Sequence, residues 1–155
     1  MLDYTQLRVH DQIVKKPEVI RFLASSPRHK LLIVRDAKSI PNNTLDLGHA
    51  LAQWIKEYGP RDSQFAYNLQ YKVYNDVSFA TVSVSDVGTV IPVSNIGILF
   101  EPQLGYTPEE FLKRFSKNDI LILFWQGDIK GNRLYLPDVH SNCTIDLTEI
   151  NHLVI

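Results

Sequence analysis

Apolar residues along the chain gather in short continuous runs, separated by longer segments with helical periodicity. The runs over 30–35 and 119–125 read Lys-Leu-Leu-Ile-Val-Arg and Asp-Ile-Leu-Ile-Leu-Phe-Trp, and a third run occupies 95–100. Short runs that are apolar on both faces are typical of strands buried inside a parallel sheet. We therefore predict that these three segments are adjacent strands of one mainly parallel sheet.

Helical periodicity predicts the elements that would cover this sheet. A helix over 46–58 would bury one face and end at Gly59-Pro60; the face comprises Leu47, Leu51, Trp54, Ile55 and Tyr58. The capping box Thr107-Pro-Glu-Glu110 predicts the start of another helix. Alternating strands and helices indicate one three-layer α/β domain over 1–155, with two short helices in 1–26, a core over 30–155, and a last strand at 152–155.

The segment from 65 to 84 is open to two interpretations. Bulky apolar residues alternate with small or polar ones over 65–73, and Asn75-Asp76 is typical of a turn, so we predict an added β-hairpin. Tyr67, Tyr71 and Tyr74 would also align on one side of a helix, which is the alternative. We interpret the aromatic stripe as a packed face rather than a base-stacking surface, because Lys72 is its only positive charge.

Composition narrows the function classes. The chain has 155 residues, 45% of them hydrophobic, which suits one packed domain, and its formal net charge is −1. This balance favours neither nucleic acid nor an anionic membrane as a partner, and we interpret the basic clusters Lys15-Lys16 and Lys113-Arg114-Lys117 as solvated helix faces. No apolar run approaches the ~18 residues of a membrane span, so we expect a cytoplasmic protein with no membrane partner.

Few residues offer catalytic or metal chemistry. Cys143 is the only cysteine, which excludes an intramolecular disulfide and a cysteine-based zinc site, and we interpret it as a structural thiol. The five histidines lack the spacing of metal-ligating pairs, so we expect no metal. Glu101, at the end of the run over 95–100, could act as an acid at the sheet edge or serve as a turn residue.

The C-terminal half resembles a known family. The segments Asn95-Ile-Gly-Ile-Leu-Phe-Glu-Pro-Gln-Leu104, Phe111-Leu-Lys-Arg-Phe-Ser-Lys-Asn118 and Trp125-Gln-Gly127 are similar to those of BrxF, the small P-loop protein of bacteriophage-exclusion (BREX) defence systems. The resemblance covers roughly residues 30–155 and implies a P-loop NTPase fold with a role in anti-phage defence.

The nucleotide motifs of that family are missing from this chain. Its Walker A loop would fall in the segment from Arg35 to Thr44, which has no glycine to let backbone N–H groups cradle a phosphate. Lys38, Ser39 and Thr44 are the remaining candidates for nucleotide contact, and Ser94 stands where a Mg²⁺-organising aspartate would be expected. The resemblance therefore implies a degenerate P-loop domain without a cofactor and without catalytic activity.

We accordingly expect an accessory subunit of a defence complex that acts through contacts with other protein subunits. The candidate interface is the end of the strand over 119–125 and the turn after it, comprising Trp125, Asp128, Lys130, Asn132 and Arg133. Two alternatives stay open: an atypical nucleotide-binding protein or NTPase that uses Lys38, Ser39 or Thr44, and a nucleic-acid-binding module supported by the small basic clusters.

Overall fold

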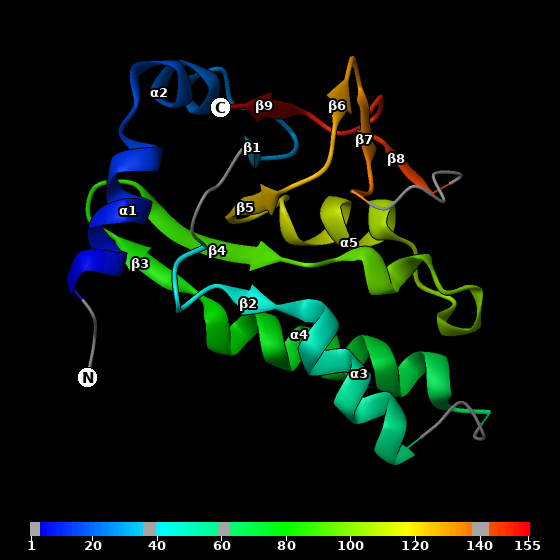
Figure 1. The fold of residues 1–155 in the computed structure, drawn as a ribbon. Coiled ribbons are helices and arrows are strands. Elements are labelled where there is room, and N and C mark those ends of the chain that lie inside the picture. Colours follow the sequence, from blue (N-terminus) through cyan, green and yellow to red (C-terminus); the bar gives the residue numbers. More distant parts are fainter. Residues whose placement is uncertain (1–3, 36–39, 59–62, 138–142) are drawn as a thin grey trace.

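The computed structural model describes residues 4–35, 40–58, 63–137 and 143–155 (Figure 1). Its centre is a sheet in which five parallel strands follow the order β2-β4-β5-β1-β9, with β3 antiparallel to β4 at one side. These strands are β1 (Leu31–Arg35), β2 (Leu45–Asp46), β3 (Val82–Val84), β4 (Gly88–Ser94), β5 (Ile120–Trp125) and β9 (His152–Val154).

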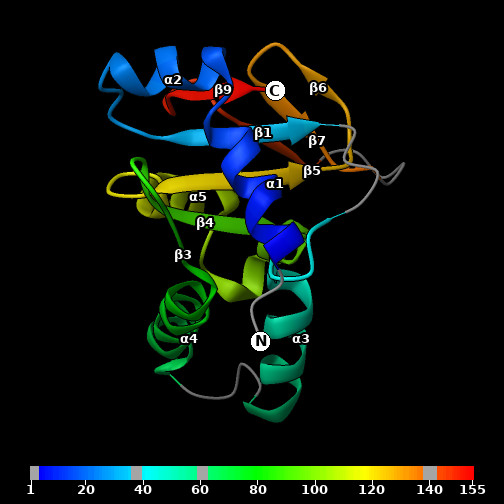
Figure 2. The same ribbon diagram turned by 90° about the vertical axis from the view of Figure 1, so that its left-hand side faces the viewer.

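Helices cover both faces of this sheet (Figures 1 and 2). Helices α1 (Tyr4–Val14) and α2 (Pro17–Ala24) lie on one face, and α3 (Leu47–Tyr58), α4 (Phe65–Ala80) and α5 (Pro108–Phe115) lie on the other. Side chains alternate accordingly along β1: Leu32 packs with α1 and α2, whereas Leu31 and Ile33 join the core beneath α3, α4 and α5. The predicted three-layer α/β fold with a mainly parallel sheet is confirmed.

A second, smaller sheet stands beside α5. It consists of the antiparallel strands β6 (Ile129–Lys130), β7 (Arg133–Tyr135) and β8 (Thr144–Asp146). The β6–β7 turn contains Gly131 with φ +60°, a backbone conformation that glycine adopts at no steric cost. This hairpin follows β5 directly, as the sequence predicts for the turn after Trp125.

Most boundaries of the predicted elements are confirmed. The strands expected at 30–35 and 119–125 are β1 and β5, which pair in parallel, and the last strand is β9. The capping box is present, because the N–H of Glu110 donates to the Thr107 hydroxyl over 3.1 Å. The two N-terminal helices are α1 and α2, and α2 begins at Pro17.

The prediction of a strand over 95–100 is wrong. The strand is β4, which ends at Ser94, and Gly97–Phe100 form the short 3-10 helix η2, which η3 (Pro102–Leu104) follows. The chain turns at Asn95, whose φ of +57° ends the strand, and Ile96 and Leu99 then enter the core from the helical turn. Pro92 makes β4 difficult to recognise in the sequence, because a proline lacks the amide hydrogen that a central strand normally donates to its neighbour.

The hairpin predicted over 65–84 is also misplaced, and the helical alternative is correct. Helix α4 spans the tyrosines, and the hairpin is instead formed by β3 and β4, with Asp86 (φ +67°) and Gly88 (φ +123°) near its turn. Residues spaced four apart on α4 are buried; they are Phe65, Leu69, Val73 and Val77. The apolar residues of this segment repeat every two residues, as in a strand, and also every four residues, as in a helix. Packing against the core selects the helix.

Candidate functional site

The carboxyl edge of the parallel sheet contains a pocket of about 320 Å³. Pairing of Asp46 with Ser94, and of Ser94 with Phe124, brings the ends of β2, β4 and β5 to one level. Ligands of open α/β sheets bind at this edge, so the pocket is the first candidate for a ligand-binding or catalytic site. Its lining combines four polar side chains with apolar walls: Asp46, Ser94, Asn95, Gln126, Ile40, Ile96, Phe124, Trp125, Leu136 and Pro137, together with Gly97.

Internal hydrogen bonds occupy the polar corner of this carboxyl-edge pocket. The Asp46 carboxylate accepts the N–H of His49 over 3.0 Å at the start of α3 and the side-chain amide of Asn95 over 2.8 Å. The N–H of Gly48 in turn donates to the carbonyl of Asn95 over 2.9 Å. The carboxylate therefore already neutralises the positive end of the α3 dipole, which an anionic ligand would otherwise use.

This arrangement is unsuited to a phosphate group. Among the described residues that line the pocket, none is basic, and the exposed Asp46 would repel an anion. Ser94, which stands where the resemblance would place a Mg²⁺-organising aspartate, is buried at the end of β4 and offers a hydroxyl rather than a carboxylate. Thr44 has a buried hydroxyl without a hydrogen-bond partner and does not line the pocket. Lys38 and Ser39 lie outside the described residues.

The predicted interface at the end of β5 needs one correction. Trp125 is only 4% exposed: its indole packs in the core beneath α3, α4 and α5, and its N–H donates to the Asp128 carbonyl over 3.3 Å. It therefore cannot act as the exposed anchor that we expected. The reason is that β5 lies in the middle of the sheet, so its last side chain is covered by the β6–β7 hairpin that follows.

The other four candidates are exposed around the β6–β7 hairpin: Asp128, Lys130, Asn132 and Arg133. Two of them have intramolecular contacts. Arg133 donates to Thr144 over 3.2 Å and pairs with Asp146 at 3.8 Å, and the Lys130 ammonium lies 5.6 Å from the centre of the Tyr135 ring. These four residues stay candidates for a contact surface.

The remaining candidates that the structure describes lie in separate segments of the chain. Glu101 is an exposed residue between η2 and η3, not at a strand end, and Cys143 is half-buried. His10 and His29 are buried, and burial lowers the pKa of both imidazoles. Across the described ranges, no three His, Cys, Asp or Glu side chains come together in a way that could hold a metal ion.

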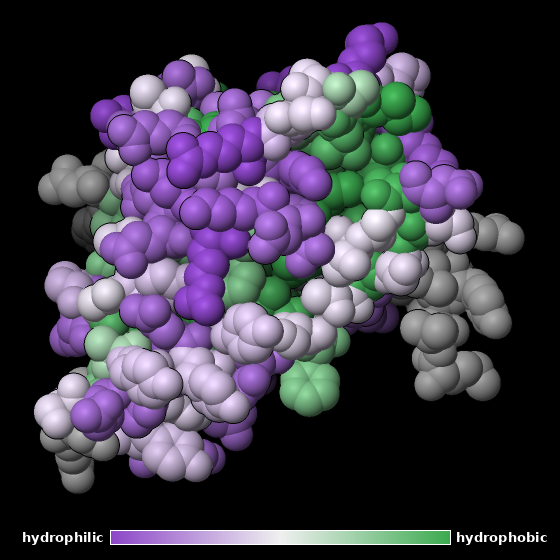
Figure 3. All heavy atoms as spheres, turned by 180° about the vertical axis from the view of Figure 1, so that it is seen from behind, coloured by the Kyte–Doolittle hydropathy of each residue, from purple (hydrophilic) through white to green (hydrophobic). Residues whose placement is uncertain are grey.

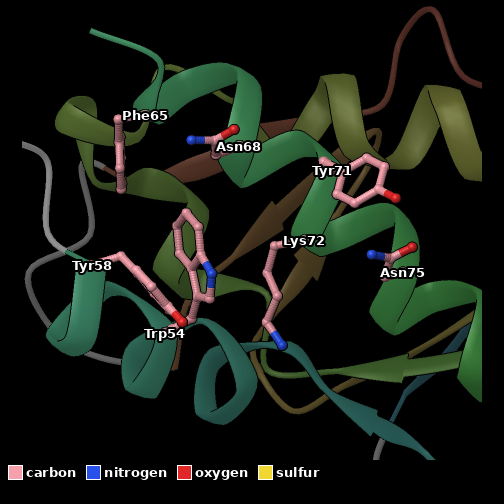
Figure 4. Close-up of a pocket in the computed structure, with 7 residues that line it drawn as sticks. All are labelled: Trp54, Tyr58, Phe65, Asn68, Tyr71, Lys72 and Asn75. Atoms are coloured by element: carbon pink, nitrogen blue, oxygen red, sulfur yellow. The ribbon is translucent and has the colours of Figure 1, made fainter. Parts of the chain in front are cut away.

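A second hollow, which the sequence did not reveal, lies between α3 and α4 (Figure 4). It has a volume of about 360 Å³, and its walls are Trp54 and Tyr58 from α3 and Phe65, Asn68, Tyr71, Lys72 and Asn75 from α4. The Trp54 indole stacks on Phe65, with ring centres 5.6 Å apart and planes inclined by 28°. The Lys72 ammonium pairs with Asp76 at 3.0 Å, so the described lining of this hollow has aromatic and amide walls and no free cation.

A third hollow adjoins the second, because Tyr71 lines both. It has a volume of about 280 Å³, and its lining consists of Tyr67, Gln70, Tyr71, Tyr74 and Arg114. Tyr67 and Tyr71 are 70% and 62% exposed, which is unusual for aromatic side chains. The predicted burial of the whole stripe, and of Tyr58 on α3, is therefore wrong. The sequence contained one signal for this exposed row of side chains, the spacing of the tyrosines by four and three residues. That spacing places them on one side of the chain only if the segment is a helix.

An exposed apolar surface lies over α2 and the edge strand β9, and we name it the α2–β9 patch. Phe22 and Leu23 of α2 pack in one apolar cluster with Leu153 of β9 and the adjoining Ile155, and we include the exposed Ile20, which precedes Leu23 by one helical turn. Ile20 is 53% exposed, and the other four are half-buried. Figure 3 shows hydrophobic surface gathered over α2 and the C-terminal strand. Since β9 is the last strand of the sheet, none of the described strands pairs with its outer edge.

No family model, curated protein or solved structure matches this chain. None of the helices among the described residues has the length and apolar character needed to cross a bilayer.

Proposed function

We propose that this protein is a non-catalytic accessory subunit of a prokaryotic anti-phage defence system of the BREX type, and that it acts through contacts with other protein subunits. The resemblance of the segments around Asn95 and Trp125 to the BrxF family motivates the assignment to a defence system. The three-layer fold with a mainly parallel sheet is compatible with that resemblance.

The chemistry of the carboxyl edge supports a non-catalytic role. A P-loop enzyme needs backbone donors and a cation around the phosphates, together with an acid that organises Mg²⁺. Here the segment after β1 contains no glycine, the end of β4 has Ser94, and the carboxylate in the pocket is already bonded to Asn95 and to the α3 amino terminus. A nucleotide would meet a negative charge without a matching cation among the described lining residues.

The observation that carries the proposal is the α2–β9 patch. An apolar surface at the unpaired edge of a sheet tends to associate unless another chain covers it. A partner subunit could cover Ile20 and Leu153 and add a strand to the free side of β9, which is a recurring mode of protein recognition. The affinity would then come from main-chain hydrogen bonds and from burial of the half-exposed apolar side chains.

Co-purification with the products of the neighbouring genes tests this proposal. The chain would be expressed from its native operon with an affinity tag, and Ile20→Glu would be compared with the matched variant Phe79→Glu. Both changes place a carboxylate on an exposed helix position, since Phe79 is 91% exposed, but only Ile20 belongs to the patch. We expect Ile20→Glu to reduce recovery of a subunit at least tenfold and to reduce protection against phage, and Phe79→Glu to change neither.

Recovery of the same subunit with both well-folded variants would remove the patch from the interface. Absence of any co-purifying subunit with the native sequence would overturn the accessory role.

The alternative, an atypical nucleotide-binding protein, is favoured by the presence of a polar pocket at the carboxyl edge. Calorimetric titration with ATP or GTP and Mg²⁺ separates the two functions. Under the leading proposal no saturable heat is expected at millimolar nucleotide, whereas binding that is lost in Ser94→Ala would establish the alternative.

A further inference from the structure

Cationic side chains from two separate elements gather beside the tyrosines of α4. The Arg114 guanidinium of α5 lies 5.7 Å from the centre of the Tyr74 ring and 5.4 Å from that of Phe115. These distances are typical of cation–π contacts, which hold the guanidinium against the aromatic row. Arg114 also lines the hollow that contains Tyr67 and Tyr71, so a ligand there would meet aromatic rings and a positive charge together.

The positive charge extends from Arg114 along α5 and onto the loop before β1. Burial lowers the pKa of His29, and the charges of Arg28, Lys117 and Lys113 lower it further, so these three cations lie close enough to act on the same imidazole. Lys113 pairs with Glu149 at 2.9 Å. Within the described residues Arg28, Arg114 and Lys117 form no ion pair, so three cations of this cluster lack an internal counter-charge.

Both features lie on the same side of the molecule. Seen from behind, strongly hydrophilic surface covers the region of α5, and paler surface, typical of tyrosine, covers the region of α4 below it (Figure 3). In Figure 2 both helices lie toward the left of the view, which is the rear of the molecule in Figure 1. The surface is therefore a row of aromatic hollows with a basic border, and we name it the α4–α5 face.

We propose that the α4–α5 face binds single-stranded nucleic acid. Unpaired bases would enter the two hollows that share Tyr71 and stack on the aromatic rings, and the phosphates would follow Arg114, Lys117 and Arg28. Asn68, Gln70 and Asn75 line the hollows, and their amides can donate to and accept from base edges. This activity is additional to the protein contacts proposed above, because none of these residues belongs to the α2–β9 patch.

The arrangement favours unpaired strands over a duplex and over an acidic protein. Tyr67, Tyr71 and Tyr74 are three or four residues apart on one helix, which separates them by about 4.5–6 Å along its axis. Successive unpaired bases can therefore reach successive rings, whereas the bases of a duplex are stacked inside it. An acidic peptide would use the cations but would gain little from two open aromatic hollows with amide walls.

Fluorescence anisotropy with labelled oligonucleotides of about 20 residues tests the proposal, with oligo-dT and oligo-U as separate probes and a duplex of the same length as the comparison. We expect saturable binding of one or both single strands at about 50 mM salt and at least tenfold weaker binding of the duplex. The three unpaired cations predict that the logarithm of the binding constant falls with the logarithm of salt with a slope of about −2.

Matched variants separate stacking from charge. Tyr71→Ala should weaken binding by about five- to 150-fold with the salt slope unchanged, whereas Phe79→Ala, an exposed aromatic of the same helix outside both hollows, should have no effect. Arg114→Gln should reduce the magnitude of the slope by about 0.7, and Arg21→Gln on the opposite face should leave it unchanged. Circular dichroism verifies that all four variants are folded.

Failure of both single strands to bind below about 100 μM at 50 mM salt would overturn the proposal. Equal loss with Tyr71→Ala and Phe79→Ala would also overturn it, as would tighter binding of polyglutamate than of either oligonucleotide. The last outcome would identify an acidic protein segment as the ligand. None of these results would alter co-purification through the α2–β9 patch, so the two proposals can fail separately.

Discussion

Replacing Gly48 with alanine should destabilise the protein, although the same change inside most helices is stabilising. Gly48 lies in the first turn of α3, where alanine would be favoured over glycine by about 0.5–1 kcal/mol on backbone entropy alone. An added Cβ, however, would overlap the side-chain amide of Asn95, lying 2.8 Å from its Cγ and 3.1 Å from its backbone oxygen. Asn95 would have to turn away from Asp46.

The lost contact outweighs the gain in helix propensity. The Asn95–Asp46 hydrogen bond, 2.8 Å long, involves a carboxylate, and such bonds contribute about 1.5–3 kcal/mol. Because both side chains are exposed, the lower end of that range applies, and the backbone of Asn95 must also shift. We expect a net loss of about 1 kcal/mol in the free energy of unfolding, which for a chain of this size lowers the melting temperature by about 2–4 °C.

Urea unfolding at 25 °C, followed by circular dichroism, measures this loss in a double-mutant cycle. Asn95→Gly removes the obstructing side chain and tolerates the φ of +57° at that position. In the Asn95→Gly background, Gly48→Ala should be neutral or stabilising by up to about 1 kcal/mol, so the two changes should couple by about 1–2 kcal/mol. If Gly48→Ala stabilises the native sequence, Asn95 does not pack against Gly48 and Asp46 as described, and the prediction is refuted.

Three further predictions concern other parts of the molecule. His10→Leu should raise the free energy of unfolding by about 1–3 kcal/mol at pH 7, because both ring nitrogens of the buried imidazole lack partners. Burial lowers the pKa of His10, so on acidification the unfolded chain takes up a proton at a higher pH than the folded chain does. The free energy of unfolding, measured by urea titration, should therefore decrease below pH ~6.5 less steeply in His10→Leu than in the native sequence. An identical pH dependence in the two proteins would contradict this prediction. Gly127→Ala should cost at least about 2 kcal/mol, because its Cβ would overlap the Tyr135 carbonyl and disrupt the hairpin bond from Tyr135 to Asp128; a melting temperature within about 2 °C of the native value would refute it. Lys38→Ala should leave phage protection unchanged at normal protein abundance, because the segment around it has no glycine to form a phosphate cradle, and a loss of protection in plaque assays would restore the nucleotide hypothesis.

The sequence by itself determined the class of fold and several of its elements. Continuous apolar runs identified β1 and β5 because a strand covered on both faces has no position for a polar residue. Local capping chemistry identified the start of α5, since Thr107 and Glu110 are close in the chain and need no other element to interact. The absence of glycine after β1 and the single cysteine can be read from the sequence directly: the first argues against a glycine-rich phosphate loop, and the second excludes an intramolecular disulfide.

Tertiary packing alone decided that the segment over 65–80 is a helix and which of its aromatic residues are buried. The pattern there fits two periods, and only the core beneath α4 selects the helix that buries Phe65 and Leu69 and exposes Tyr67 and Tyr71. Trp125 shows the converse: a residue at a strand end looks exposed in the sequence but is covered by the hairpin that follows it. The local pattern of a segment records how its side chains alternate, but the neighbours that cover each face come from distant parts of the chain.

The same reason explains why the two proposed surfaces could not be found from the sequence. Arg114 reaches Tyr74 from a different helix, and Arg28 and Lys117 meet around His29 from separate elements, so no window of sequence contains the aromatic row together with its charges. The α2–β9 patch likewise joins residues near the two ends of the chain. Surfaces of this kind exist only after the parallel sheet has brought its strands into the order β2-β4-β5-β1-β9, because that order determines which side chains become neighbours and which edge stays unpaired.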